Sequence, residues 1–377
     1  MNATTDIKAL RVDHVGSLLR PPSLIQAFAD FHDAKIDAQE LRLLQDQAIR
    51  DVVAKQVAHG LPIVNDGEYR REVFGQSFSR VAGLEDWWSP KSIPVRHEHV
   101  HYERGGYNPP AKVQRRRPSE RIRLVHNDIA DEYAFVSALT DTPAKVTLIG
   151  IDRIIHGYGQ PAAGDVYASL EQFVADLIEV QRQLIAGVVE AGGRYVSIDE
   201  PSLTGYVDPA TIAELEARGE DPHEHLSRAI RADNEVIAGH PGVTFGVHLC
   251  RGNRQSLWHR EGFYDDIAEQ LFNELDFDRF LLEYDTPRAG SFAPLRFVPK
   301  GKIVVLGLIT TKTGEIEQVD AVIRRIEEAA RYVPIEQLAL SPQCGFASVI
   351  QGNLLSEDAQ WRKLDLVSEV ARRVWGG

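Results

Sequence analysis

Short apolar runs alternate with long amphipathic stretches from one end of the chain to the other. The apolar runs have the length of buried strands, and in the stretches between them apolar residues recur with the helical period. This alternation is typical of repeated βα units built around a parallel sheet. The runs predict eight strands, at residues 11–16, 61–66, 145–150, 195–200, 244–250, 280–285, 303–309 and 338–344.

Two of the predicted helices have recognisable ends. Asp37 precedes Glu40 by three residues, which is the spacing of a capping box, and Gly60 ends the same helix. The last helix starts after Ser356 and runs to Trp375. The core-facing side of the earlier helix is predicted to carry Leu41, Leu44, Ala48, Ile49, Val52 and Val53.

Eight strands, each followed by a helix, predict an α/β fold of the (β/α)8 TIM barrel class, with residues 1–377 forming a single domain. A doubly wound sheet is the alternative. It would more often bring a Gly-rich phosphate-binding turn after its first strand, and the sequence has none there. In a barrel, the functional residues are expected at the C-terminal ends of the strands.

Residues 81–126 do not fit the repeat. They are rich in Trp, Pro, Arg and His, and they predict an excursion between the second and third strands. The basic run at 115–117 is expected to be a solvated turn, a contact in a homo-oligomer, or an anion-steering rim over the barrel mouth. His97, His99 and His101 alternate on one face of a predicted strand, but no Cys or carboxylate at suitable spacing supports a metal site there.

The overall composition limits the class of protein. The formal net charge of -13 argues against general binding to nucleic acid or to an anionic membrane. No stretch approaches about 18 uninterrupted apolar residues, and the N-terminus lacks the apolar core of a signal peptide. We therefore expect a cytoplasmic protein whose cysteines remain thiols.

Both cysteines of the chain lie in runs suited to a metal site. Cys250 follows His248 by two positions, so on one strand the two side chains point to the same face. Cys344 ends another predicted strand, and Glu283 provides a carboxylate at the end of a third. Two thiolates, an imidazole and a carboxylate suit Zn²⁺ better than Mg²⁺ or Ca²⁺.

Further polar residues stand at or just after the ends of predicted strands. Together they would form a polar ring around the candidate zinc site, at one face of the barrel. These residues are Ser17, Glu68, Asp199, Glu200, Asp285 and Lys312.

Over nearly its whole length the chain resembles the catalytic half of cobalamin-independent methionine synthase, through the motifs DHVGSLLRP, NDGEYRR, SIDEP, HLCRGN, EYDTPRAG, LGLITTKT and LSPQCGFAS. The resemblance is closest to the short single-barrel members of that superfamily, which include epoxyalkane:coenzyme M transferase (2-hydroxypropyl-CoM lyase). It implies a zinc ion to which a thiol substrate binds as an additional or replacing ligand. The protein ligands that it implies are His248, Cys250, Glu283 and Cys344.

The same resemblance places Ser17, Glu68 and Asp199 where the methyltransferase binds the polar end of its amino-acid thiol. Two residues depart from the family pattern. Ile151 stands where the family has a Trp that stacks on folate, and Lys312 stands where it has an acid/base His. The N-terminal half of the long enzyme has no counterpart. These departures weaken the case for a folate methyl donor.

The sequence therefore predicts a zinc-dependent epoxyalkane:coenzyme M transferase, in which the thiolate of coenzyme M opens a short-chain epoxide. The alkoxide product needs a proton, for which the candidate donors are Lys312, Tyr284 and His14. The sulfonate of coenzyme M needs cationic partners. The available groups are Arg20, Arg70, Arg71 and the run 115–117.

Other functions remain open at this point. Glu68 and Asp199 would suit an ammonium better than a sulfonate, which keeps a methyltransferase acting on homocysteine and methylfolate as the alternative. A zinc-binding or thiol-binding protein without catalytic activity is a further possibility. A decarboxylase of the related uroporphyrinogen type would leave His248, Cys250 and Cys344 unexplained.

Overall fold

Six parallel strands form the central sheet of this computed structural model, which describes residues 6–89, 113–158 and 166–376. Each strand pairs with the next one along the chain, in the order β3 to β8, without a reversal of direction across the sheet. This order fits the barrel prediction and not a doubly wound sheet, in which the strand order reverses. The strands are β3 (Val146–Ile149), β4 (Tyr195–Asp199), β5 (Thr244–Leu249), β6 (Arg279–Glu283), β7 (Ile303–Ile309) and β8 (Leu338–Pro342).

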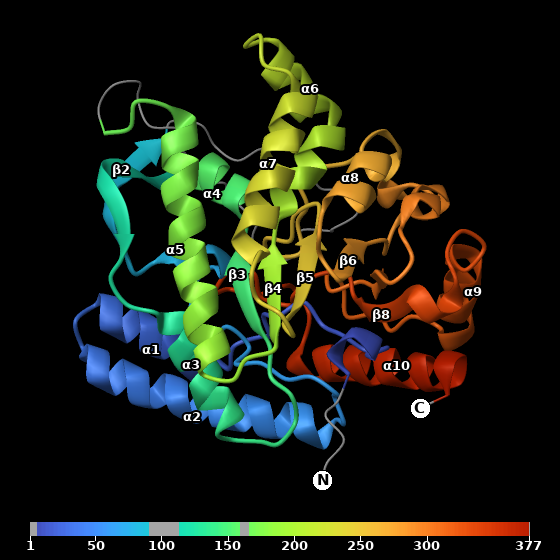
Figure 1. Cartoon of the computed structure of the whole chain (residues 1–377). Coiled ribbons are helices and arrows are strands. Elements are labelled where there is room, and N and C mark those ends of the chain that lie inside the picture. The colour runs from blue at the N-terminus through green and yellow to red at the C-terminus, as the bar shows by residue number, and fades with distance from the viewer. Residues whose placement is uncertain (1–5, 90–112, 159–165, 377) are drawn as a thin grey trace.

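Helices cover the outside of the strands, as in a βα repeat (Figure 1). In Figure 1, α5 and α7 lie in front of the strands β3 to β5, and α10 lies below β8. The α-helices are α1 (Pro22–His32), α2 (Ala38–Ala58), α3 (Asp128–Ser137), α4 (Ile151–Tyr158), α5 (Leu170–Glu190), α6 (Pro209–Glu216), α7 (Pro222–Ile237), α8 (Ala268–Glu274), α9 (Val319–Ala329) and α10 (Glu357–Trp375).

The first two predicted strands are wrong, because neither segment forms a strand in the structure. In the region of residues 11–16, Val12 makes one parallel bridge to Leu340 of β8, and in the region of 61–66, Val64 makes one to Ala144, just before β3. The two segments therefore flank the two edges of the six-stranded sheet. They also contact each other, since the backbone N–H of Leu18 donates to the carbonyl of Gly67 at 3.1 Å. The arrangement is that of a barrel, but the described ladder covers six strands.

Side chains take the place of ladder hydrogen bonds in the second of these segments. The amide of Gln56 in α2 donates to the carbonyl of Asn65 at 2.7 Å and accepts from its N–H at 3.1 Å. Pro62 has no N–H to offer a neighbouring strand. Apolar patterning identified a buried segment here, but it could not reveal that a helix side chain satisfies the backbone.

The helix-end predictions are confirmed. Asp37 Oδ1 accepts from the N–H of Glu40 at 2.8 Å, and Glu40 Oε2 accepts from the N–H of Asp37 at 3.0 Å. Gly60 has a φ of 67°, which lies in the left-handed region that follows a helix end. The predicted apolar face of α2 is wrong at one position, because Leu44 is 47% exposed whereas its other five members are buried.

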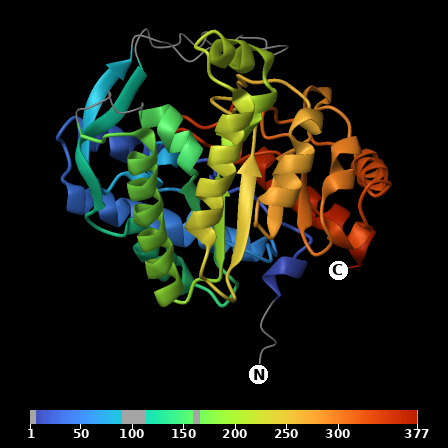
Figure 2. The ribbon, with the colours of Figure 1, turned by 45° about the horizontal axis from the view of Figure 1, so that its top comes forward.

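The predicted excursion contains a two-stranded antiparallel hairpin of β1 (Val81–Ser89) and β2 (Val113–Leu124). Figure 2 shows this hairpin at the edge of the molecule, apart from the central strands. Arg121 of β2 forms an ion pair with Asp176 of α5 at 2.6 Å, which ties the hairpin to the barrel helices. The three alternating histidines at 97, 99 and 101 lie outside the described residues.

The barrel interior contains a buried ion network. Asp13 accepts from Lys145 Nζ at 2.8 Å and from the hydroxyl of Tyr195 at 2.6 Å, and Arg279 lies 3.1 Å from it. Although burial opposes ionisation, Lys145 and Arg279 hold the pKa of Asp13 well below its usual range.

Among the described helices, none combines the length and the apolarity that a membrane span requires.

Candidate metal and substrate site

Three of the predicted metal ligands meet at one end of the sheet. His248 and Cys250 come from the end of β5, and Cys344 follows β8. One ligand atom from each residue lies within 4.8 Å of the others, and all three residues are buried. The pairing of β5 with β6 and of β7 with β8 brings together residues that are nearly a hundred positions apart in the sequence.

The His248 ring is oriented as a metal-binding imidazole is in other proteins. Its Nδ1 lies 3.1 Å from the carbonyl of Leu281, while Nε2 is buried and has no nitrogen or oxygen partner among the described residues. A carbonyl on one ring nitrogen fixes the tautomer that presents the other as a ligand. A hydrogen bond from the Cys344 thiol, together with His248, holds the pKa of the Cys250 thiol well below its usual range. This set of donors fits a soft divalent ion such as Zn²⁺.

Glu283 stands at the end of β6 beside this cluster, but its carboxylate is held by other groups. Oε1 accepts from Arg288 Nη2 at 2.7 Å, and Oε2 accepts from the backbone N–H of Arg251 at 2.7 Å. Burial opposes its ionisation, yet Lys312, Arg288 and Arg251 together hold its pKa below the usual range. Glu283 is therefore an ionised carboxylate, and its role as a fourth ligand stays a prediction.

Two further carboxylates lie next to the cluster. Asp199 ends β4 and is in register with His248 of β5. Burial and the charge of Glu68 raise the pKa of Asp199 to about 7, against the opposing effect of His248. Both residues are buried, and Oδ1 of Asp199 and Oε2 of Glu68 have no hydrogen-bond partner among the described residues. Two neighbouring carboxylates with unpartnered oxygens suit a positively charged group.

Ser17 and Lys312 also lie close to the candidate ligands. The hydroxyl of Ser17 accepts from the N–H of Ala347 at 3.3 Å, and a Cβ built on Gly345 would lie 2.0 Å from it, so Ser17 touches the loop that carries Cys344. Lys312 donates to the carbonyl of Gly252 at 3.0 Å. Its charge acts on both Glu283 and Cys344, which places it beside the predicted metal ligands.

The two other predicted proton donors lie in less suitable places. Tyr284 comes directly after Glu283, the last residue of β6, and its ring packs on Tyr264 and Phe292 with centroids 5.4 and 4.8 Å away. His14 is buried inside the barrel, where burial and Lys145 lower its pKa to about 3. The neutral imidazole of His14 and the aromatic packing of Tyr284 therefore do not support a role as proton donor for either residue.

The arginines predicted for an anionic substrate are engaged elsewhere. Arg20 donates to the carbonyls of Glu68, Arg71 and Ala347 at 2.8, 2.6 and 3.2 Å. Arg70 donates to Asp46 at 2.6 Å. It lines a cavity of about 480 Å³ beside α1, α2 and α3, which none of the predicted metal ligands lines. Both arginines thus have partners within the protein, while Nε of Arg20 and both Nε and Nη1 of Arg70 are buried without a hydrogen-bond partner among the described residues.

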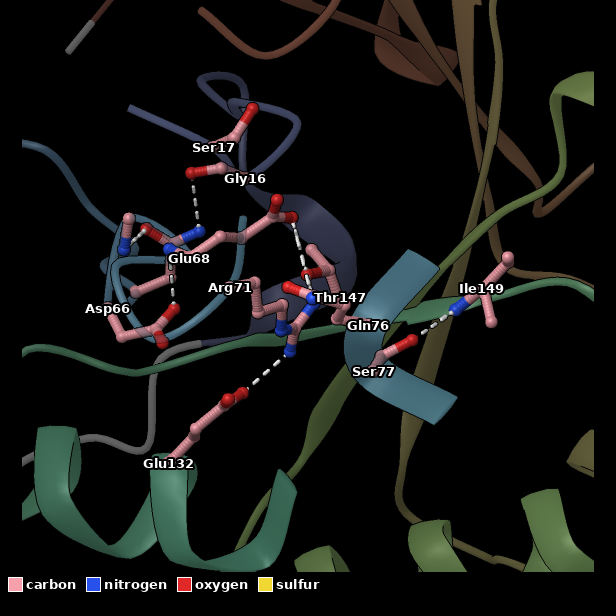
Figure 3. A network of polar contacts seen from close by, with 12 residues as sticks. Gly16, Ser17, Asp66, Glu68, Arg71, Gln76, Ser77, Glu132, Thr147 and Ile149 are labelled. Atoms are coloured by element: carbon pink, nitrogen blue, oxygen red, sulfur yellow. Dashed lines mark hydrogen bonds and ion pairs between the residues drawn. The ribbon is translucent and has the colours of Figure 1, made fainter. Parts of the chain in front are cut away.

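Sequence reasoning missed two residues that shape the site, Arg288 and Thr147, and it considered Arg71 only as a partner for a sulfonate. Arg288 holds Glu283 and lies over the ring of Trp258 at 4.4 Å. Arg71 and Thr147 connect to Glu68, as Figure 3 shows. Each had a weak signal: Arg288 belongs to the motif EYDTPRAG, Arg71 belongs to NDGEYRR, and Thr147 is a polar residue inside an otherwise apolar strand.

Comparison with known proteins identifies the family. The sequence model described as "Cobalamin-independent synthase, Catalytic domain" matches residues 130–359. The chain belongs to this family. The candidate metal site lies within the matched region, and Glu68 and Ser17 lie before it.

Several relatives match this chain over almost their full length. The Bacillus subtilis protein YxjH, described as uncharacterized, is 34% identical over 369 residues, which cover 97% of this chain and 94% of that protein. A methionine synthase of Saccharolobus solfataricus is 24% identical over 355 residues, with 93% and 90% covered. One of these two relatives is thus named a methionine synthase, and neither name mentions an epoxide or coenzyme M.

Solved structures agree on the fold. A putative vitamin-B12 independent methionine synthase from Listeria monocytogenes has a TM-score of 0.72 and 29% identity, with 98% of each chain covered. A B12-independent methionine synthase from Shewanella sp. W3-18-1, solved with selenomethionine, has a TM-score of 0.72 at 18% identity, with 97% of this chain and 98% of that chain covered. The predicted superfamily and fold class are thereby confirmed.

Proposed function

We propose that the protein transfers a methyl group to the thiol of an amino acid of the homocysteine type, at a zinc ion bound by His248, Cys250, Cys344 and Glu283. The single observation that carries this proposal is the placement of the two carboxylates Glu68 and Asp199 beside three soft metal ligands. A thiol group and an ammonium group on one small substrate would match these two halves of the site. This is the alternative, rather than the main function, that the sequence predicted.

The predicted metal ligands define the chemistry of the part of the site that would bind the thiol. A free alkyl thiol has a pKa of roughly 8.5, so little of it is thiolate at neutral pH. Zinc, when bound, supplies a positive charge that favours the thiolate while leaving the sulfur nucleophilic. Glu283, Cys250 and Cys344 together place negative charge around the ion, and this favours a reactive sulfur over activation of water.

The polar side chains beside the metal ligands bind and orient the amino-acid end of the substrate. Glu68 and Asp199 accept hydrogen bonds from the ammonium through the oxygens that lack partners. Ser17, which touches the loop of Cys344, is positioned to bind the carboxylate end. In the transfer itself, a new bond forms between sulfur and the methyl carbon, and the bond from that carbon to the donor nitrogen breaks. The electron pair stays on the nitrogen, which then takes up a proton.

The arginines argue against coenzyme M as the thiol. A sulfonate needs cationic or N–H donors, but Arg20 already donates to carbonyls, and Arg70 donates to Asp46 and lines a cavity that none of the predicted metal ligands lines. Arg71 is paired with Glu132 at 2.6 Å, and Arg117 with Glu85 at 2.7 Å. Carboxylates beside the metal cluster would instead repel a sulfonate. The names of the relatives favour methionine synthesis as well.

Product analysis tests this function. Zinc-loaded protein is incubated with homocysteine and 5-methyltetrahydrofolate, and methionine is measured by mass spectrometry, with the Cys344→Ser variant as the inactive control. A parallel reaction contains coenzyme M and 1,2-epoxypropane. Methionine formation that depends on Cys344 supports the proposal. Consumption of the epoxide without any methionine formation overturns it and restores the epoxide function.

The identity of the methyl donor depends on the residue at position 151. Ile151 begins α4 and is buried, so it offers no aromatic face for a folate ring. A smaller methyl donor is therefore tested in the same assay. S-methylmethionine provides a methyl group without a pterin, and methionine formed from it but not from the folate would assign a donor of that class.

A further inference from the structure

Thr147 connects the substrate carboxylate Glu68 to a buried arginine (Figure 3). The hydroxyl of Thr147 donates to Glu68 Oε1 at 2.8 Å, and Arg71 Nη1 lies 3.0 Å from the same hydroxyl oxygen. The other arm of Arg71 donates to Glu132 Oε2 at 2.6 Å. All four residues are buried, and Arg71 and Glu132 line the cavity beside α1, α2 and α3.

The direction of these hydrogen bonds is fixed by chemistry. A guanidinium can only donate, so the Thr147 oxygen must accept from Arg71. The single proton of the hydroxyl is then available only for Glu68. Arg71 therefore holds the hydroxyl of Thr147 as a donor toward Oε1 of Glu68, which leaves Oε2 as the oxygen without a partner.

The contacts of Arg71 leave one oxygen of Glu68 available for a cation. Arg71 lies 3.9 Å from Glu68 but makes its short contact, at 2.6 Å, with Glu132. The short contact of Arg71 is thus with Glu132 and not with Glu68, and Oε2 of Glu68 has no partner among the described residues. That oxygen is therefore open to a cation of the substrate.

The backbone around Glu68 is also arranged for this purpose. Glu68 has a φ of 60°, a left-handed conformation that is costly for a residue other than glycine, and its N–H donates to Asp66 Oδ1 at 2.9 Å. A Cβ on Gly16 would lie 2.7 Å from Cγ2 of Thr147 and 3.0 Å from Oε1 of Glu68. Only glycine at position 16 allows the carboxylate and the threonine to approach each other this closely.

We infer that Thr147 and Arg71 are positioning residues that fix Glu68 for ammonium binding, and that they make the site selective for thiols that carry an amino group. Neither residue is a predicted metal ligand or touches the reacting sulfur. Their effect reaches the substrate through Glu68 alone. This inference rests on the proposed function, because it assumes that Glu68 binds the ammonium of the thiol substrate.

Two thiols separate this role from a merely structural one. Homocysteine and 4-mercaptobutanoate differ only by the amino group, so the second compound does not use Glu68. Binding of each thiol to zinc-loaded protein is measured by isothermal titration calorimetry, alongside zinc content and the thermal unfolding midpoint. The Thr147→Val variant keeps the shape of the side chain and removes the hydroxyl, whereas Thr147→Ser keeps the hydroxyl and serves as the matched control.

We expect Thr147→Val to weaken homocysteine binding by about tenfold or more, which is the range for losing a hydrogen bond to a charged group. Binding of 4-mercaptobutanoate should change by less than about twofold, and Thr147→Ser should bind both thiols as the wild type does. An equal loss for both thiols, or no loss for homocysteine, overturns the inference.

Arg71→Lys provides an independent second test. Lysine keeps the positive charge but lacks the fork that reaches Thr147 and Glu132 at once. We expect the same selective loss of homocysteine binding, and an Arg71→Lys variant that retains full preference for homocysteine overturns the role of Arg71. Failure of the proposed function has a different signature, because the wild type itself would then bind homocysteine no better than 4-mercaptobutanoate.

Discussion

The guanidinium of Arg288 lies 2.7 Å from Glu283 Oε1, so a residue of the loop after β6 holds the carboxylate at the end of that strand. Arg288 is itself held against the ring of Trp258 at 4.4 Å. This contact orients the carboxylate that we predict to be the fourth zinc ligand. It also keeps that carboxylate ionised inside the protein.

Glu283→Gln should weaken zinc binding by about tenfold or more while the fold is preserved. The amide has nearly the same shape, but it removes the negative charge and replaces one oxygen with a donor that faces Arg288. Zinc affinity is measured by competition with a chromophoric chelator. The control is Ser291→Ala, an exposed change in the same loop. Zinc affinity equal to that of the wild type would remove Glu283 from the ligand set.

Cys250→Ser and Cys344→Ser should each abolish stoichiometric zinc binding, because a serine hydroxyl is a much poorer zinc ligand than a thiolate. Elemental analysis of the purified variants measures this directly. Ser348→Ala is the matched control, since its hydroxyl lies 3.9 Å from Cys344 Sγ without being a predicted ligand. One zinc per chain retained in both cysteine variants would contradict the site.

Lys312→Ala should reduce turnover by about 10²-fold or more, the range for loss of a general acid. Lys312 is buried beside the predicted ligands, and we propose that it delivers a proton to the leaving group. Zinc content and thiol binding should remain those of the wild type, which separates a proton-transfer role from a role in binding. Unchanged turnover would assign protonation to solvent.

The stability of the protein should fall as pH rises between about 4 and about 8, partly because of Asp233. Burial and the charge of Asp152 raise the pKa of Asp233 from 3.8 to about 8. The native state therefore keeps a proton that the unfolded chain releases, so this stabilisation is complete below pH 4 and lost as pH passes 8. Each bound proton contributes at most about 1.4 kcal/mol per pH unit.

Asp233→Asn should flatten this dependence, because the amide cannot ionise. Urea unfolding of the variant and of the wild type at several pH values between 4 and 9 measures the difference in slope. The neighbouring Glu200 is shifted in the same direction, again chiefly by burial, so a smaller slope should persist in the variant. Identical slopes in both proteins would show that Asp233 does not retain its proton.

Asp13→Asn should destabilise the fold by about 3 to 5 kcal/mol, because it leaves Lys145 and Arg279 buried without their counterion. The free energy of unfolding is obtained from urea denaturation. Lys35→Ala is the control, since its ion pairs are exposed and should contribute far less to stability than a buried pair. A loss of stability no larger than that of the control would contradict the importance of this network.

The sequence alone determined the features that follow from local periodicity. Residues two apart on a strand face the same way, so the approach of His248 to Cys250 was fixed by their spacing. The capping box at Asp37 and the helix start at Ser356 depend on contacts within three residues, and both are present. The family motifs extended this local information to the fold class and to the superfamily.

Tertiary structure decided what depends on residues far apart in the chain. No pattern shows that Arg20 would bind three carbonyls, that Gln56 would replace the ladder at Asn65, or that Thr147 would donate to Glu68 from 79 positions away. A charged or polar side chain can satisfy its hydrogen bonds with many partners, and its choice depends on which groups the packed barrel brings within about 3 Å. The sequence could therefore place candidate residues at the strand ends, but only the packed barrel determined which of their atoms find a hydrogen-bond partner and which do not.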